Sequence, residues 1–599
     1  MSGVQEESVK RLPERAELPV ESTWDLSRIF ASEEVFEAAC AEVRGQIEEA
    51  HRFYGLMGAS AVSFLDGLER VLDVYRRLEP LYTFAHLLHD QDTADARGQE
   101  LLSKVGTLRT RVGEAFSWVE PEILELSDEQ IEAFFLAEPR LSVYRHYVDG
   151  LLRNRPHILS KKEELLLAGA GEILDSGADI FGVLNNADLV FPVVKDDEGA
   201  SVQLSHGLYG RLMESTNREV RRGAFEGIYG VYRQFQNTLA STLSAQVKSH
   251  NFLARVRQFG SAREAALHGN AIDTAVYDTL VTVVHENLHL LQEYVGRRKE
   301  LLGLDELHMY DLYTPLYGEP PVRYSYEEAK AHVLAALAPL GEEYGEVLRR
   351  AFSDRWIDVY ENRGKRSGAY SAGCYDTDPY ILLNWHDSLD QMFTLAHELG
   401  HSVHSYFSRK YQPFVYGDYS IFLAEIASTT NEILLTEYLL ATQTDPAVRR
   451  YVVNHYLDGF KGTVFRQTQF AEFEHLIHSK EAEGVPLTAE FLCEAYMDLN
   501  RKYYGDEVIS DPEIAFEWSR IPHFYYHYYV YQYATGFSAA SALASAILEE
   551  GEPAVERYLG FLKAGSSEYP IEVMKRAGID MTDAGYLRNA VKKFEKGFR

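Results

Sequence analysis

The stretch Phe393-Thr394-Leu395-Ala396-His397-Glu398-Leu399-Gly400-His401-Ser402-Val403-His404 carries the most specific pattern in this chain. It lacks proline, and its apolar residues recur at three- and four-residue steps, which predicts an α-helix. His397 and His401 lie one turn apart on such a helix, so both imidazoles can bind one metal ion. Glu398 follows the first histidine directly, where it can reach a metal-bound water. The alternative is a surface or core helix that carries these residues by coincidence.

The composition is that of a soluble globular protein large enough for more than one domain. The chain has 599 residues, of which 46% are hydrophobic and 25% charged, and a net charge of −32. A strongly negative protein repels nucleic acid and anionic membrane surfaces, and no basic patch is evident. We therefore expect neither nucleic acid nor membrane as a partner.

Three cysteines, Cys40, Cys374 and Cys493, are scattered over the chain. An odd, dispersed set argues against a disulfide framework and favours a reducing compartment. The first residues contain no apolar stretch typical of a secretory signal, and no run of about 18 apolar residues predicts a transmembrane helix. We expect a cytoplasmic location.

The rest of the sequence predicts a mainly α protein. Only 19 prolines interrupt it, and residues 217–258 are helical in pattern almost throughout. Ser127–Gln130 and Ser325–Glu328 each fit a capping box before a helix. Two regions have strand patterns: residues 189–204 predict a hairpin, and residues 356–385 predict a small β-sheet just before the histidine helix. The hairpin suggests a boundary near residue 200, between an N-terminal helical domain, 1–200, and a second domain, 201–599, that contains the histidine helix and would be the catalytic one.

A catalytic zinc needs a third protein ligand. His404 shares a helix face with His397, but about 10 Å of helix separates them, and no break lies between His401 and His404 to turn the chain. We therefore expect His404 to be a core histidine or one that contacts a ligand, with direct binding of the metal by His404 as the alternative.

Glu425 is the better candidate for the third ligand. It lies in Phe422-Leu423-Ala424-Glu425-Ile426-Ala427, within a predicted second helix, where an acid among apolar residues needs a partner. The 24 residues after His401 suffice for a loop and a return. Glu432 lies two turns after Glu425 and can bond a ligand histidine, or form an ordinary salt bridge.

These residues resemble the thimet-oligopeptidase-type (M3) zinc peptidases. The sequences around His397–His404 and around Glu425 are most similar to the oligoendopeptidase F group. The resemblance also covers Gly368-Ala369-Tyr370-Ser371-Ala372-Gly373 and the Tyr-rich segment 523–533, from about residue 110 onward. It implies a large helical bundle that encloses a deep substrate channel, one Zn²⁺ ion per chain, and short unstructured peptides as substrates. Nothing in the sequence indicates the oligomeric state.

The implied reaction uses Glu398 as general base on a zinc-bound water. The resemblance implies that a histidine and tyrosines of the segment 523–533 contact the substrate carbonyl, and His523, Tyr528 and Tyr531 are the matching candidates. The glycine-containing stretch before the histidine helix could hold an extended peptide by strand addition, through the backbone of Gly368, Ala369 and Tyr370.

Two alternatives to an endopeptidase remain open. A dipeptidyl carboxypeptidase of the same family would need a cation for the substrate's C-terminal carboxylate, and Arg501, Lys502 and Arg520 lie near the aromatic segment. A non-catalytic peptide-binding protein with a structural zinc would need a fourth ligand, and Cys374 is the only nearby cysteine.

Overall fold

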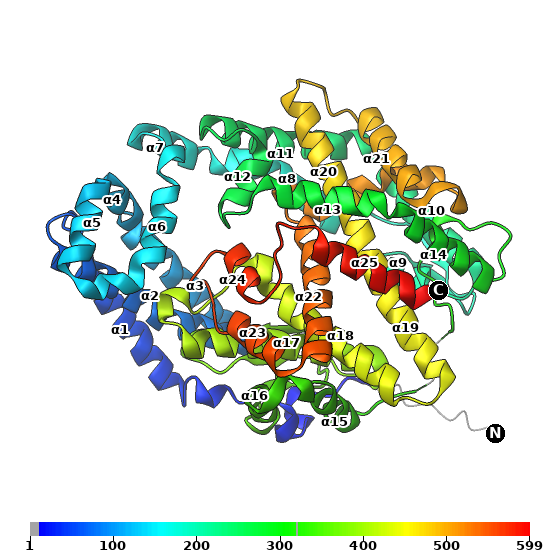
Figure 1. Ribbon diagram of the computed structural model, residues 1–599, viewed down its shortest axis with the longest axis horizontal. Coiled ribbons are helices and arrows are strands. Elements are labelled where there is room, and N and C mark those ends of the chain that lie inside the picture. Colours follow the sequence, from blue (N-terminus) through cyan, green and yellow to red (C-terminus); the bar gives the residue numbers. More distant parts are fainter. Residues whose placement is uncertain (1–10, 319–321) are drawn as a thin grey trace, which may run out of the picture. The chain divides into compact units, whose positions relative to one another are not determined.

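The computed structural model describes residues 11–318 and 322–599. Helices make up 72% of the protein, and in the described residues they are accompanied by two small sheets. Figure 1 shows this helical architecture. The predicted mainly α fold is therefore confirmed. No helix within the described ranges is long and apolar enough to cross a membrane.

The chain forms two compact units, each built from stretches far apart in the sequence. Unit 1 contains residues 11–155 together with Val322–Leu435 and Ala546–Glu568. Unit 2 contains residues 156–318 together with Thr436–Ser545 and Tyr569–Arg599. This division differs from the sequence-based one at residue 200, which stays a prediction.

Unit 1 begins with a helical core around α2. Ser60 caps α2 by accepting a hydrogen bond from Ser63 N, and buried residues at three- and four-residue steps face α1 and α3. The helices that lie wholly within unit 1 are α1 (Glu33–His51), α2 (Ala61–Asp90), α3 (Ala96–Phe116), α4 (Val119–Glu125), α5 (Asp128–Ala137), α6 (Arg145–Arg153), α15 (Tyr326–Ala336), α16 (Gly341–Ser353), α17 (Leu389–Tyr411) and α23 (Glu552–Leu562). Helices α18 (Ile421–Thr442) and α22 (Tyr531–Glu550) contribute residues to both units.

Unit 1 also holds the small sheet expected before the histidine helix. Its strands are β3 (Ile357–Asp358), β4 (Tyr370–Ala372) and β5 (Tyr380–Leu382), in the order β3-β5-β4. Strand β5 runs parallel to β3 and antiparallel to β4. All three residues of β5 are buried, as expected for a central strand, and the chain continues from it into α17. The sheet therefore positions the start of that helix.

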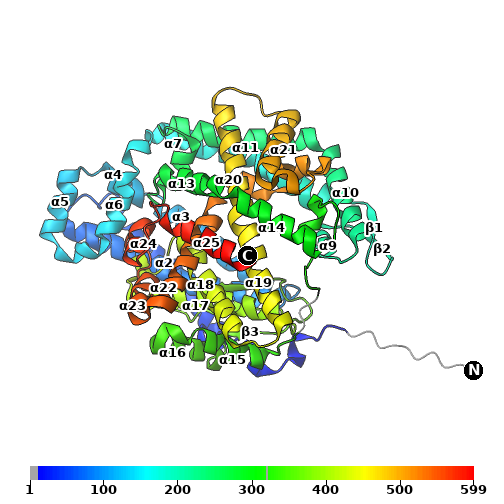
Figure 2. The same cartoon turned by 45° about the vertical axis from the view of Figure 1, so that its right-hand side comes forward.

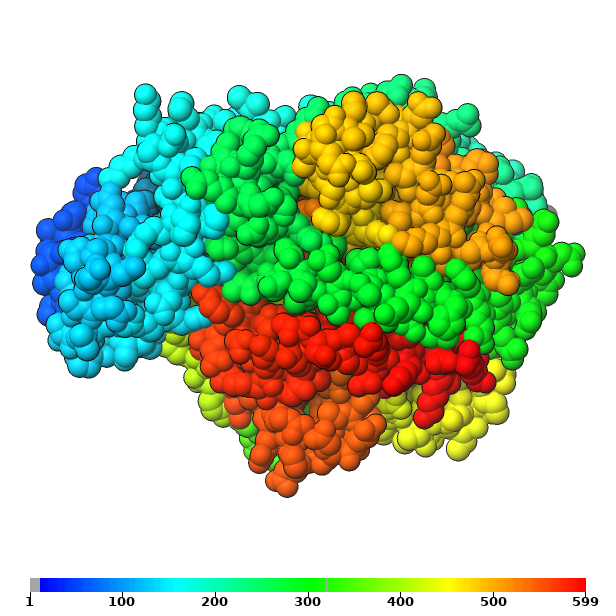
Figure 3. Space-filling view, turned by 45° about the horizontal axis from the view of Figure 1, so that its top comes forward, coloured from blue at the N-terminus to red at the C-terminus, as the bar shows by residue number. Residues whose placement is uncertain are grey.

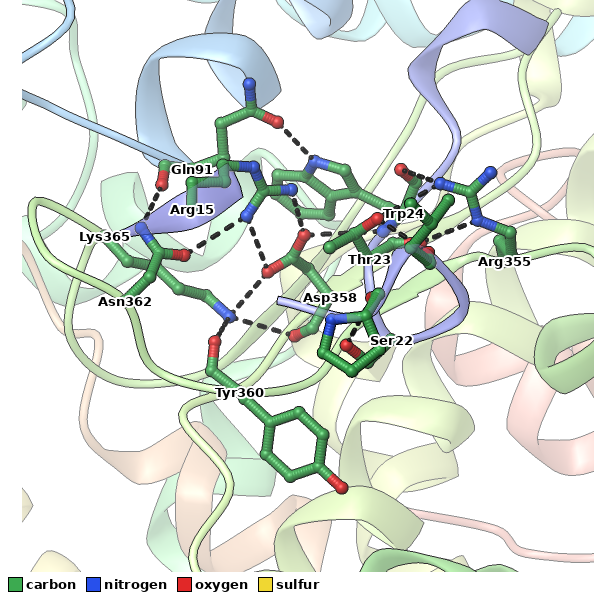
Figure 4. A network of polar contacts seen from close by, with 12 residues as sticks. Arg15, Ser22, Thr23, Trp24, Gln91, Arg355, Asp358, Tyr360, Asn362 and Lys365 are labelled. Atoms are coloured by element: carbon green, nitrogen blue, oxygen red, sulfur yellow. Dashed lines mark hydrogen bonds and ion pairs between the residues drawn. The ribbon is translucent and has the colours of Figure 1, made fainter. Parts of the chain in front are cut away.

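A buried ionic network fixes β3 to the N-terminal segment of unit 1 (Figure 4). The carboxylate of Asp358 is fully buried and lies 2.7 Å from Lys365 Nζ, whose side chain is also fully buried. Arg15 Nη1 donates to Asp358 Oδ1 at 3.1 Å and to Asn362 Oδ1 at 3.2 Å. One carboxylate thus pairs with two cations, and its loss would leave buried positive charge without a counter-ion.

We expect Asp358→Asn to destabilise unit 1 by about 3–5 kcal/mol, because it leaves the buried Lys365 without a counter-ion. A lower chemical denaturation midpoint would show this loss. The control is Asp376→Asn, which breaks a half-exposed ion pair with Arg76 and should cost at most about 1 kcal/mol. Equal midpoints for the two variants would contradict the argument.

Unit 2 is a second helical assembly that carries the predicted hairpin. Its helices are α7 (Lys161–Gly169), α8 (Gly171–Val183), α9 (His206–Met213), α10 (Arg218–Gln234), α11 (Gln236–Val256), α12 (Ala262–His268), α13 (Thr274–Glu286), α14 (Leu288–Leu301), α19 (Pro446–Phe460), α20 (Arg466–Ala482), α21 (Ala489–Tyr504), α24 (Pro570–Arg576) and α25 (Gly585–Phe598). Strands β1 (Val193–Lys195) and β2 (Ser201–Gln203) pair antiparallel beside α10 (Figure 2). Figure 3 shows the green surface of α13 and α14 running along the red α25, where Arg588 pairs with Glu286.

The local sequence signals agree with these elements. Both capping boxes form, at Ser127 before α5 and at Ser325 before α15. The continuous helical pattern of residues 217–258 becomes two helices, α10 and α11, which meet at Phe235. The hairpin is confirmed, with strands shorter than the pattern suggested.

Candidate metal centre

Helix α17 presents the two histidines from a buried scaffold. Ser388 caps it by accepting a hydrogen bond from Gln391 N. Its side chains Phe393, Leu395, Ala396 and Leu399 are at most 2% exposed, so one face is fixed in the core of unit 1. The predicted helix is confirmed and extends further in both directions than the apolar run.

Glycine at position 400 lets α18 approach α17 closely. A Cβ built on Gly400 would lie 2.5 Å from Ser428 Cα and 2.9 Å from Ala427 O, both in the backbone of α18. The fully buried Asn431 adds a link by donating from Nδ2 to Ala396 O at 3.0 Å. The close contact brings Glu425, one turn before Ser428, opposite the two histidines.

The atoms that could bind a metal converge. His397 Nε2 lies 3.1 Å from His401 Nε2, and Glu425 Oε2 lies 3.4 Å from the first and 3.5 Å from the second. Three ligands of a tetrahedral zinc ion, each about 2.1 Å from the metal, lie about 3.4 Å from one another. His397, His401 and Glu425 therefore fit a zinc ion in donor chemistry and in spacing.

Glu432 and Ser428 orient these ligands. Glu432 Oε1 lies 2.5 Å from His397 Nδ1, an arrangement that directs Nε2 of the same ring toward the metal position. Ser428 Oγ donates to Glu425 Oε2 at 3.2 Å. Of the two contacts considered for Glu432, the structure shows the one with His397, and its role beside a metal ligand stays a prediction.

The cluster is electrostatically matched to a cation. Burial disfavours a charged His397, but its hydrogen bonds with Glu425 and Glu432 outweigh this effect and raise its pKa to about 10. Burial also opposes ionisation of Glu425, yet hydrogen bonds to His397 and His401 hold its pKa well below the usual range. Two acidic groups thus favour positive charge at this point, whether it is carried by protons or by a metal.

Glu398 lies beside the cluster with an unused carboxylate oxygen. The residue is 7% exposed, and Oε2 has no hydrogen-bond partner among the described residues. Burial raises the pKa of Glu398, while the neighbouring His397 and His401 oppose that rise. A buried carboxylate with a free lone pair is costly unless a further group, such as a water at the metal, uses it.

His404 lies apart from the ligand set. It is 1% exposed, its ring stacks on Tyr419 with 3.6 Å between ring centroids, and neither ring nitrogen has a partner in the described part of the chain. Burial lowers its pKa far below the usual value. His404 thus lies in the core as a neutral ring, and direct ligation stays an untested alternative.

The strand expected to hold a peptide lies at the edge of the sheet. Strand β4 pairs with β5 on one side only, and Ser371 Oγ lies 2.8 Å from Ser402 Oγ of α17. Gly368 precedes the strand with a φ of +86°, a conformation that favours glycine. Strand β4 is therefore joined to the histidine helix through Ser371, and contact of the Gly368, Ala369 and Tyr370 backbone with substrate stays a prediction.

The aromatic segment 523–533 belongs to unit 2 and divides into accessible and buried rings. His523 is partly exposed, and its ring contacts those of Tyr526, Tyr529 and Tyr533. Its Nε2 lies 3.4 Å from Tyr533 OH. We refer to these four residues as the His523 cluster.

Tyr528 and Tyr531, the two tyrosines chosen from the sequence, are each only 3% exposed. Tyr528 has a φ of +54°, its N–H donates to Glu474 Oε1 at 2.7 Å, and its hydroxyl lies 3.2 Å from His475 Nδ1. The Tyr531 ring packs on Tyr277. Their role as donors to a substrate stays a prediction, and their burial favours the phenols of the His523 cluster instead.

Two buried histidines, His250 and His478, and the partly buried His527 pack beside Tyr528 in unit 2. His250 Nδ1 lies 3.1 Å from His478 Nε2, and the His527 ring stacks on His250. His478 Nδ1 lies 2.8 Å from the carbonyl oxygen of Glu474, which can only accept a hydrogen bond. His478 therefore carries its proton on Nδ1, and its Nε2 accepts from His250 Nδ1. Burial lowers the three pKa values, to about 2 for His250, about 3 for His478 and about 4 for His527.

Unit 2 should therefore lose stability as the pH falls from about 6.5 toward 4. In the unfolded chain these rings take up protons near pH 6.5, so acid favours the unfolded state by about 1.4 kcal/mol per ring and pH unit. Thermal melting at stepped pH would measure the slope. His478→Gln should flatten it, whereas His386→Gln, at an exposed histidine, should leave it unchanged. An equal slope in both variants would assign the acid sensitivity to other groups.

Sequence reasoning missed the residues that hold α18 against α17. Gly400 falls between the two histidines, and Asn431 lies on the predicted second helix, but neither of them is assigned a role from the sequence. Two signals were available: a small residue on the inner face of a helix, and a polar residue embedded among apolar ones.

Comparison with known proteins agrees with this geometry. Residues 211–593 match the model of peptidase family M3, and residues 122–191 match a model described as oligopeptidase F. Oligopeptidase PepF of Bacillus subtilis is 52% identical over 592 residues, covering 99% of this chain and 88% of the relative. Group B oligopeptidase PepB of Streptococcus agalactiae is 50% identical, covering 97% of each chain.

The fold has the same relatives. The crystal structure of oligoendopeptidase-F from Enterococcus faecium superposes with a TM-score of 0.74 at 52% identity, over 94% of this chain and 98% of that one. The resemblance stated from the two helical motifs is thereby confirmed. Since the family model spans more than half of the chain and includes both ligand-bearing helices, this protein is a peptidase that belongs to family M3.

Proposed function

We propose that the chain is a zinc-dependent endopeptidase that hydrolyses internal bonds of short, unstructured peptides. The observation that carries the proposal is the convergence of His397, His401 and Glu425 beside Glu398, whose buried Oε2 has no hydrogen-bond partner in the described residues. Among the described residues the group offers three ligands, which leaves a position for water as catalytic zinc sites require.

When bound, zinc would supply a water of pKa near 7 and polarise the substrate carbonyl. Glu398 takes a proton from the attacking water and returns it to the departing amine nitrogen. Glu432 holds the His397 ring by its Nδ1, so that the ligand nitrogen keeps its direction during turnover.

Two further parts of the proposal concern the substrate. The free edge of β4 would add an extended peptide as an extra strand, through backbone groups near Ala369. Hydrogen-bond donors from the His523 cluster would stabilise the oxyanion. Replacing Tyr529 by phenylalanine should then lower kcat with little change in KM, because the interaction forms mainly in the transition state.

The alternatives differ in their products. A dipeptidyl carboxypeptidase releases dipeptides from a free C-terminus, whereas an endopeptidase also cuts peptides with amidated C-termini. A non-catalytic protein with a structural zinc cuts neither. Cys374, the possible fourth ligand in that reading, is buried and is not part of the metal-binding group that the described residues form.

The test is to incubate the purified protein with a mixed-length peptide library, half of it C-terminally amidated, and identify the products by mass. We expect internal cleavage of both halves, abolished by a chelator and restored by Zn²⁺. Dipeptide release from free C-termini alone would favour the carboxypeptidase, and absence of products would refute catalysis. A folded protein added to the mixture should stay intact if the active site lies in a channel.

A further inference from the structure

A cavity on unit 2 combines cationic and apolar walls. It measures about 610 Å³ and lies between α14, α19 and α25, which run side by side in Figures 1 and 2. Arginines line it at positions 297, 298, 449 and 450, and no carboxylate residue of the described chain is among its lining. In a protein of net charge −32, such a lining is unexpected.

Two of these arginines have no carboxylate partner. Arg450 makes no ion pair in the described residues, and its guanidinium carbon lies 5.7 Å from the centre of the Tyr317 ring. Arg449 donates to the carbonyl oxygens of Leu440 and Gln443 at the end of α18, so it caps a helix and forms no ion pair with a carboxylate in the described residues. Both guanidinium groups are therefore available to an anion.

Residues in contact with Arg298, which lines the cavity, add to the positive charge. Arg298 is fully buried and donates to Asp458 Oδ1 at 3.0 Å, while Lys461 Nζ donates to the same oxygen at 2.9 Å. Two cations thus share one carboxylate. A buried excess of positive charge is costly, and an anion bound above it would reduce that cost.

The remaining walls are apolar. Leu301 is 47% exposed and Tyr317 is 40% exposed, and Leu316 also lines the cavity. Large apolar side chains exposed in one concave place mark a binding site more often than isolated ones do. The ligand that fits carries an anionic group and an apolar group close together.

We propose that this cavity binds the C-terminal residue of short peptides that end in a large apolar residue with a free carboxylate. Such a residue holds the carboxylate and the apolar side chain on one carbon atom, and the planar guanidinium fork matches a carboxylate. Inorganic phosphate satisfies the arginines but not the apolar walls. No residue of the metal-binding group lines the cavity, so this is a second peptide site.

The inference rests on the proposed function only for the supply of peptides. Each hydrolysed bond gives the N-terminal product a new free carboxylate, so the proposed reaction generates this class of ligand. Binding is measured without turnover, in full-length protein carrying Glu398→Gln. Failure of the wild-type protein to cleave peptides would therefore leave the cavity proposal standing. Failure of peptides to bind the cavity would likewise leave the proposed endopeptidase activity standing.

Isothermal titration calorimetry with N-acetyl-Gly-Gly-Leu tests the proposal. We expect the free acid to bind at least about tenfold more tightly than its C-terminal amide, since the amide removes a charge-assisted contact. The Gly-Gly-Gly acid should bind about tenfold more weakly, because it lacks the buried leucine side chain. Phosphate binding as tight as that of the leucine peptide would reduce the cavity to an anion site and overturn the assignment.

Variants locate the binding. Arg450→Glu should weaken the leucine peptide at least about tenfold, whereas Arg588→Glu, at a surface ion pair elsewhere on unit 2, should not. Leu301→Ser should weaken binding of the leucine peptide and leave binding of the glycine peptide unchanged. Unchanged binding of the glycine peptide would show that the cavity remains folded. His397→Ala removes the metal-binding group and should leave the affinity unchanged. Loss of binding in His397→Ala, or unaltered binding in Arg450→Glu, would overturn the proposal.

Discussion

Replacing Glu398 by glutamine is expected to lower kcat about 10²–10⁴-fold while the protein still binds one metal ion. Glutamine keeps the volume of the side chain but cannot accept the proton of the attacking water, and general-base catalysis contributes an effect of this size. The metal should stay because the ligand atoms belong to His397, His401 and Glu425. Peptide cleavage followed by mass spectrometry checks the fall in kcat, and metal content measured on the same sample checks that the ion is retained.

The control is Glu346→Gln, at an exposed glutamate of α16 in the same unit. It removes the same charge from the protein and should leave kcat unchanged. Comparable activity of Glu398→Gln and the parent protein would exclude the proposed base. Loss of metal together with activity would instead show that Glu398 supports the ligand set, and the kinetic result would then say nothing about proton transfer.

Much of the site could be predicted from the sequence because its signals are local. The spacing of His397 and His401 on an apolar run defines a helix face by geometry alone, and an acid such as Glu425 among apolar residues needs a partner. The physical reason for preferring Glu425 to His404 is also local, since three atoms in one helical row cannot surround one ion, and the structure brings Glu425 rather than His404 to the two histidines; which residues bind the metal stays a prediction.

The parts that could not be predicted depend on long-range packing. Tyr528 and Tyr531 differ from Tyr526 and Tyr529 in burial, yet all four are tyrosines of one short segment, and no periodicity separates them. The positive φ of Tyr528 interrupts any regular alternation. Likewise, the two compact units combine stretches far apart in the chain, which no linker composition marks. The cytoplasmic location stays a prediction.

Gly400→Ala is expected to weaken zinc binding about 10–100-fold, although residue 400 contributes no ligand atom. The added methyl group would lie 2.5 Å from Ser428 Cα, which is backbone and cannot rotate away. Helices α17 and α18 must then separate, at a cost of about 1–3 kcal/mol for an overpacked interior. That separation moves Glu425 away from His397 and His401, and loss of a contact that orients a metal ligand has an effect of this size.

The measurement pairs a zinc competition titration with thermal melting, and Gly113→Ala serves as the control. Gly113 lies in α3 of the same unit, and a Cβ there meets no atom within 4 Å. Alanine at that position should keep zinc affinity and raise stability by up to about 1 kcal/mol through helix propensity. If Gly400→Ala binds zinc like the parent protein, the close approach of the two helices is not what sets the ligand geometry. If instead affinity falls and Asn431→Ala, which removes the second link between the helices, has a smaller effect of the same sign, backbone contact is the dominant constraint on the metal centre.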